Sequence, residues 1–125
     1  MFDNLFGKSA SNSLPASWNS VLSTADVDSA KEASKERPIL FFKHSTRCSI
    51  SSMAYRRLEA GVEELSKNVD VYYLDLIAHR DVSNFIADNL GVTHQSPQVI
   101  LMDNGVVTYI STHGDINYQS VLEAL

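Results

Sequence analysis

The sequence has one cysteine, three prolines and fewer basic than acidic residues. With a single cysteine, one chain forms no internal disulfide and builds no cysteine-rich zinc or iron–sulfur site. Fifteen Asp and Glu against ten Lys and Arg give a formal net charge of −5. This charge argues against a phosphate-binding surface, so we expect no nucleic-acid partner. No apolar run approaches the roughly 18 residues of a membrane helix, so we expect no membrane partner.

The beginning of the sequence lacks the features of a secretory signal. It carries an early acid at Asp3, no basic cluster, and no apolar stretch of about 7–15 residues. Secreted domains of this size usually hold even numbers of cysteines, so the single cysteine favours a reducing, cytoplasmic location. Residues 1–16 are rich in Ser, Asn and Gly. This composition indicates a flexible lead-in before one domain at 17–125.

The rest of the sequence alternates between strand-like and helix-like segments. Strands are predicted at 18–22, 39–42, 69–76, 99–102 and 106–110, the last two joined by an Asn-Gly turn. Helices are predicted at about 24–34, from the polar stretch 45–52 to residue 65, at about 82–90, and from Asp115 as N-cap to the end. Gly61 weakens the second helix and allows a bend there. The order β-α-β-α-β-α-β-β-α predicts an α/β fold with a mixed central sheet flanked by helices.

Cys48 is the main candidate for chemistry. It follows the apolar strand at 39–42 and begins the long helix, where unpaired N–H groups and the helix dipole favour a thiolate. Arg47 adds a neighbouring cation, and Ser49 and Ser51 supply hydroxyl groups. A lone cysteine in a cytosolic domain is most often a small buried hydrophobe. Because polar residues surround Cys48 in the sequence, we favour the reactive interpretation.

Other positions have both an ordinary and a functional interpretation. Pro97 opens a strand, which is a normal place for proline. The four histidines lack metal-type spacing, so we expect no metal site, although His44, His94 and His113 are placed where they could meet near Cys48. Free N–H groups at Gly114 and Asp115, at the predicted start of the last helix, suit either a bound carboxylate or an ordinary cap.

Two segments, FKHSTRCSIS (42–51) and RDVSNFIADNLGVTHQSPQVILMDNG (80–105), resemble the monothiol bacilliredoxins. This YtxJ-like family belongs to the bacillithiol system and to the thioredoxin-like superfamily, and the similarity runs from about residue 18 to the end. The resemblance implies a thioredoxin-like fold with Cys48 as the redox cysteine. It also implies a cis-proline at Pro97, with the backbone of Ser96 free to pair with substrate. Family members often carry proline directly after the cysteine, where this chain has Ser49.

The resemblance implies a monothiol thiol-disulfide oxidoreductase. Its substrates would be mixed disulfides between client proteins and a small thiol, with bacillithiol as co-substrate and no tightly bound cofactor. Cys48 would be the nucleophile and Ser51 its catalytic neighbour. The residues expected to bind substrate are Arg47, Ser49, His94, Ser96, Pro97, Gly114 and Asp115. Two alternatives stay open: a glutaredoxin-like dimer sharing an iron–sulfur cluster, disfavoured because Cys48 is not followed by Gly-Phe-Ser, and a redox-inert adaptor. The oligomeric state is left open.

Overall fold

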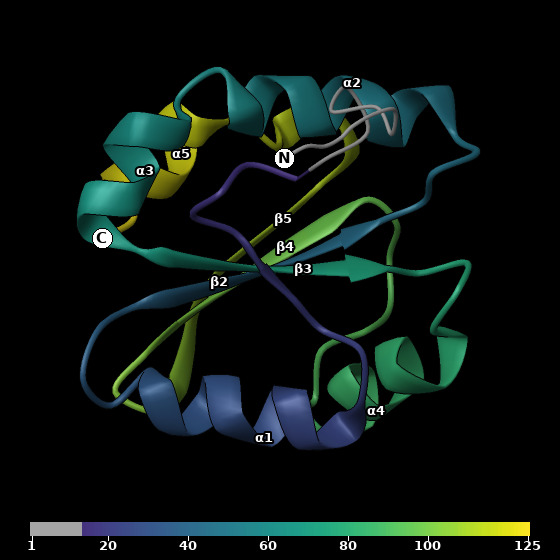
Figure 1. Cartoon of the computed structure of the whole chain (residues 1–125), viewed down its shortest axis with the longest axis vertical. Helices are drawn as coiled ribbons and strands as arrows, with labels where there is room; N and C mark the ends of the chain where they lie inside the picture. The colour runs from purple at the N-terminus through teal and green to yellow at the C-terminus, as the bar shows by residue number, and fades with distance from the viewer. Residues whose placement is uncertain (1–13) are drawn as a thin grey trace, which may run out of the picture.

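The structure is a computed structural model that describes residues 14–125, so 1–13 of the expected lead-in lie outside the described residues. Five strands form one mixed sheet in the order β1-β3-β2-β4-β5 (Figure 1). β1, β3 and β2 run parallel, whereas β4 and β5 are antiparallel to their neighbours. The strands are β1 (Asn19–Ser20), β2 (Ile39–His44), β3 (Asp70–Asp75), β4 (Gln98–Asp103) and β5 (Val106–Thr112). The predicted α/β class is confirmed.

Helices cover both faces of the sheet. Figure 1 shows α1 (Thr24–Ala33) and α4 (Arg80–Leu90) on one face. The other face carries α2 (Ser49–Glu59), α3 (Val62–Asn68) and α5 (Tyr118–Glu123). A short 3-10 turn, η3 (His113–Asp115), joins β5 to α5. Among residues 14–125, no helix combines the length and apolarity needed to cross a bilayer.

β2 lies at the centre of the sheet, and all six of its residues are buried. Successive side chains of a strand point to opposite faces. Leu40 and Phe42 therefore join the core under α2, α3 and α5, whereas Ile39 and Phe41 join the core under α1 and α4. A strand buried on both faces explains the continuous apolar run in the sequence. The C-terminal end of β2 leads directly into the turn that carries Cys48.

The long helix predicted up to residue 65 is interrupted at Gly61, which separates α2 from α3. The aromatic ring of Tyr118, from α5, lies directly against Gly61, so that a Cβ atom there would be 2.1 Å from two ring carbons. Only glycine allows this close approach. The break thus follows from the packing of α5 against the α2–α3 junction.

The predicted start of the last helix at Asp115 is wrong. Gly114 and Asp115 belong to η3, and α5 begins after Asn117. Asn117 has an extended backbone, and its side-chain oxygen accepts a hydrogen bond from the Ser120 N–H at 2.8 Å. Asp115 and Asn117 are both good N-cap types. Asn117 is the N-cap because the chain is extended at that residue.

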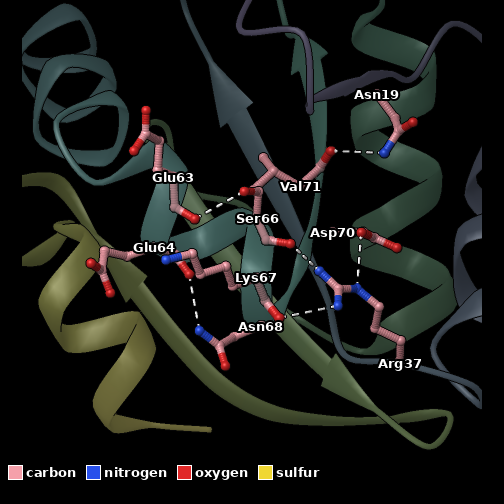
Figure 2. A network of polar contacts seen from close by, with 9 residues as sticks. All are labelled: Asn19, Arg37, Glu63, Glu64, Ser66, Lys67, Asn68, Asp70 and Val71. Atoms are coloured by element: carbon pink, nitrogen blue, oxygen red, sulfur yellow. Dashed lines mark hydrogen bonds and ion pairs between the residues drawn. The ribbon is translucent and has the colours of Figure 1, made fainter.

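An arginine connects the ends of three elements on the side of the sheet where β2 begins (Figure 2). Arg37 precedes β2, and its Nε lies 3.0 Å from Asp70 Oδ1 at the start of β3. Its terminal nitrogens donate to the carbonyl oxygens of Ser66 and Lys67 in the last turn of α3. Arg37 therefore satisfies helix-end carbonyls that have no partner within the helix.

Candidate active site around Cys48

Cys48 is the N-cap residue of α2, with an extended backbone, and is half-buried. Its N–H donates to the Ser45 carbonyl at 3.2 Å, and its carbonyl accepts from the Ser52 N–H at 3.0 Å. These two bonds fix a tight turn between β2 and α2. The sulfur therefore belongs to a residue at the positive end of the α2 dipole. Its neighbours Arg47 and Ser49 are exposed.

Ser51 is fully buried, and its hydroxyl contacts groups of β2 and the following turn. The oxygen accepts a hydrogen bond from the Ser45 N–H at 2.9 Å and lies 2.6 Å from His44 Nδ1. Burial lowers the pKa of His44, although the charge of Asp75 and the contact with Ser51 oppose this shift. A neutral imidazole leaves Nδ1 able to accept the Ser51 hydroxyl proton.

The hydroxyl of Ser51 is paired with His44 and Ser45, and within residues 14–125 it forms no hydrogen bond with the Cys48 sulfur. The role that the structure supports is a clamp between the end of β2 and the first turn of α2. The catalytic assignment of Ser51 stays a prediction.

The segment 91–97 leads from α4 into β4 and ends at Pro97. The Ser96–Pro97 peptide bond is cis, Pro97 is buried, and the Pro97 carbonyl accepts from the His113 N–H at 3.2 Å. The Ser96 hydroxyl is buried without a hydrogen-bond partner among residues 14–125. In the sheet register Lys43 of β2 is paired with Gln98 of β4. The start of β4 and the turn of Cys48 therefore lie at the same end of the sheet.

A buried polar cluster lies on the opposite face of β2 from His44. Lys43 is fully buried, and its Nζ lies 3.3 Å from both the Ser83 carbonyl oxygen and His94 Nδ1. The Ser83 hydroxyl is also 3.3 Å from His94 Nδ1. Burial lowers the pKa of Lys43 to about 8. The pKa of His94 is also lowered, first by burial and then by the charges of Lys43 and Arg80.

The histidines do not converge on one site. His44 packs against Tyr55 of α2 on one face of the sheet, whereas His94 contacts Lys43 and Ser83 on the face of α4. His113 is exposed and has a left-handed backbone, with φ of 51°. Within the described part of the chain, no group of three or more His, Cys, Asp or Glu residues is arranged to hold a metal ion.

Gly114 and Asp115 lie in η3 and are exposed, away from the first turn of α5. The η3 segment is held against α2, because Arg57 Nε donates to the Ile116 carbonyl at 2.7 Å and Arg57 Nη2 to the His113 carbonyl at 2.9 Å. The role of Gly114 and Asp115 in substrate binding stays a prediction. It was based on a helix start at Asp115, and α5 begins three residues later.

A polar cavity of about 460 Å³ lies along the flank of α2. It begins beside the Cys48 turn, and its walls include Thr46, Ser52, Arg56, Tyr55, Tyr73 and His44. The rings of Tyr55 and Tyr73 are centred 5.3 and 5.8 Å from that of His44. Burial raises the pKa of Tyr73 to about 12, so that its hydroxyl keeps its proton at neutral pH.

Comparison with known families shows the family of this chain. The family model of the monothiol bacilliredoxin BrxC matches residues 19–121. The chain therefore belongs to the monothiol bacilliredoxin family.

Solved structures similar to this bacilliredoxin have the thioredoxin fold. One, described as a candidate oxidoreductase with a thioredoxin fold, is 32% identical, with a TM-score of 0.73 over 86% of this chain and 93% of its own. Fasciola hepatica thioredoxin is 17% identical, with a TM-score of 0.65 over 84% of this chain and 93% of its own. Thioredoxin O2 from Arabidopsis thaliana is 21% identical, with a TM-score of 0.64 over 88% and 95%. The last two show the fold alone.

The family and its oxidoreductase neighbour support a redox function for this bacilliredoxin. Sequence reasoning located Cys48 but missed Lys43 and Ser83. One signal was available for Lys43, because it extends the apolar run of a central strand and a residue there is expected to be buried. Ser83 carried no such signal, because serine is ordinary within an amphipathic helix.

Proposed function

We propose that this bacilliredoxin is a monothiol thiol-disulfide oxidoreductase that removes a low-molecular-weight thiol from client proteins. The supporting observation is the position of Cys48, the only cysteine of the chain, at the start of α2 in a thioredoxin fold. A helix N-terminus favours negative charge, and the thiolate is the attacking form of cysteine.

The reaction is a transfer of one thiol group between sulfur atoms. The Cys48 thiolate attacks the small-thiol sulfur of the mixed disulfide, and a new disulfide forms between Cys48 and that thiol. The old disulfide breaks, and the client cysteine leaves as a thiolate that takes a proton from water. A second small thiol then attacks the adduct, supplies the two electrons as it is oxidised to a small-molecule disulfide, and regenerates Cys48.

The family supports bacillithiol as the small thiol, and the single cysteine favours a cytoplasmic setting for the reaction. The cavity along α2 supports a small polar ligand, because its size lies within the range of about 300–1,000 Å³ typical of ligand sites. Its wall offers the hydroxyls of Thr46 and Ser52, the guanidinium of Arg56 and the carboxylate of Glu59. These groups suit a small thiol that carries hydroxyl groups and charges of both signs.

The test uses a client protein whose cysteine is joined to bacillithiol. The wild type should release the client thiol and gain the mass of one bacillithiol on Cys48, whereas Cys48→Ser should do neither. A matched control, Cys48→Ser with Ser29→Cys, keeps one thiol but moves it to an exposed position of α1 on the other face of the sheet. Full activity in Cys48→Ser, or equal activity in the relocated-thiol variant, would overturn the proposal.

A further inference from the structure

Lys43 is the largest charged side chain in the core of the described structure. It lies in β2 between Leu74 of β3 and Gln98 of β4 in the sheet register, and it is fully buried. No carboxylate within residues 14–125 forms an ion pair with it. A buried cation with only neutral partners is costly, and a methionine would fill similar space without that cost. Such a costly residue marks a candidate functional position.

The contacts of Lys43 determine the protonation of His94. An ammonium group is a donor only, so His94 Nδ1, 3.3 Å away, must accept and therefore carries no proton. The Ser83 hydroxyl, also 3.3 Å from Nδ1, can donate to the same atom. Because burial and the charges of Lys43 and Arg80 all lower the pKa of His94, the ring is neutral at pH 7. Its single proton therefore lies on Nε2.

The protonated nitrogen of His94 has no partner within residues 14–125, and the residue is half-buried. His94 lies three residues before Pro97, in the segment that enters β4 at the end of the sheet where Cys48 lies. An Nε2–H donor there can hydrogen-bond an anionic acceptor of a bound substrate, such as a departing thiolate or a carboxylate.

We propose that Lys43 is a positioning residue, which holds the segment 91–97 through His94 and Ser83 and fixes His94 as an Nε2–H donor toward the substrate. The inference rests on the proposed reduction of mixed disulfides. It assigns a role to a residue that does not itself reach the reacting sulfurs.

The first test measures the arrangement without substrate. Long-range ¹H–¹⁵N NMR of histidine-labelled protein should show His94 as the Nε2–H tautomer in the wild type. In Lys43→Met the pKa of His94 should rise, because the nearby positive charge is gone. A wild-type ring protonated on Nδ1, or a His94 that titrates alike in both proteins, would overturn the proposal.

The second test separates positioning from a structural role. Lys43→Met should lower kcat/KM for the bacillithiol mixed disulfide about tenfold, the size expected for one hydrogen bond to a charged group. In a His94→Gln background, Lys43→Met should lower kcat/KM by less than about threefold. The amide nitrogen of Gln is a donor and has no tautomer for Lys43 to select. Lys35→Met, an exposed lysine on the α1 side, serves as the matched control.

Each outcome decides the proposal. Wild-type kcat/KM in Lys43→Met, or an equal loss in both His94 backgrounds, would overturn it. So would a Lys43→Met protein that fails to fold, because removal of the buried charge should leave this variant at least as stable as the wild type. If the wild type reduces no mixed disulfide, the proposed function fails, whereas the NMR measurements still decide the role of Lys43.

Discussion

Cys48 and Ser51 share one sequence motif but differ in environment. The cysteine is half-buried at the helix cap, whereas the serine is fully buried and bonded to His44 and Ser45. The spacing Cys-x-x-Ser suggests that the two side chains act on each other. In the structure, Ser51 instead joins the first turn of α2 to the end of β2 through its hydrogen bonds with His44 and Ser45. These bonds fix the turn that carries Cys48.

Replacing Ser51 with Ala should therefore destabilise the protein. The change leaves the Ser45 N–H and the His44 ring nitrogen without a partner in a buried setting, which costs about 1–3 kcal/mol. Urea denaturation followed by circular dichroism measures the loss. Ser49→Ala, at an exposed position of the same helix, should change the stability by less than about 0.5 kcal/mol. Equal effects of the two variants would contradict the clamp.

The sequence predicts a site residue when its position follows from a local pattern, and fails when that position depends on contacts between distant segments. Cys48 could be located because a strand, a turn and a helix start are local patterns. The partners of Ser51 and the buried position of Lys43 depend on how the end of β2 meets α2 and α4. Those contacts join segments up to about 50 residues apart, and no periodicity within one element reports them.

At the scale of elements, the strands and the helices α1 and α4 follow the predicted pattern closely. The central strands are set by short apolar runs and the helices by the 3.6-residue period, and α4 ends at Gly91, which has φ of 66°. The α2–α3 break falls at Gly61, where the sequence allowed a bend, and the start of α5 differs from prediction. Both are decided by tertiary structure, the first by the ring of Tyr118 against Gly61 and the second by the extended chain at Asn117.

Gly61→Ala should be destabilising for a steric reason. The added methyl would lie 2.1 Å from ring carbons of Tyr118, and such overpacking costs about 1–3 kcal/mol. In a Tyr118→Ala background the same change should cost much less. Gly91→Ala is the matched control, because its neighbourhood is open and its positive φ alone is unfavourable. Its cost should not depend on Tyr118. Thermal unfolding of the three single and two double variants measures the coupling, and additive effects at Gly61 and Tyr118 would refute the contact.

At the scale of the whole molecule, β2 separates two polar systems at one end of the sheet. Adjacent strand residues point to opposite faces, so His44 faces α2 and Ser51, while Lys43 faces α4 and His94. One system holds the turn of Cys48 and the other holds the segment that ends at Pro97. A single central strand thus supports both sides of the candidate site, each through a buried group whose pKa is lowered by burial.

The burial of Lys43 should be visible in the stability of the whole protein against pH. Its pKa is about 8 in the folded chain and 10.5 when unperturbed. Below pH 8 the side chain is charged in both states, and folding bears the full cost of burying the charge. Between pH 8 and 10.5 the unfolded chain binds more protons than the folded one, so the stability rises with pH across this window. The predicted gain is about 3 kcal/mol, as an order of magnitude.

Comparison with Lys43→Met isolates this effect, because Tyr, Cys and the other lysines titrate in both proteins. Urea denaturation at several pH values should show Lys43→Met as the more stable protein at pH 7.5, with the difference shrinking steadily toward pH 10.5. The comparison begins at pH 7.5 because His94 is sensitive to the charge of Lys43 and titrates at lower pH. A difference that stays constant across the window would mean that the folded and unfolded chains bind the same number of protons, so that the pKa of Lys43 stays near 10.5 despite its burial. Burial of the Lys43 charge would then carry no cost, and its buried position would no longer mark it as a candidate functional residue.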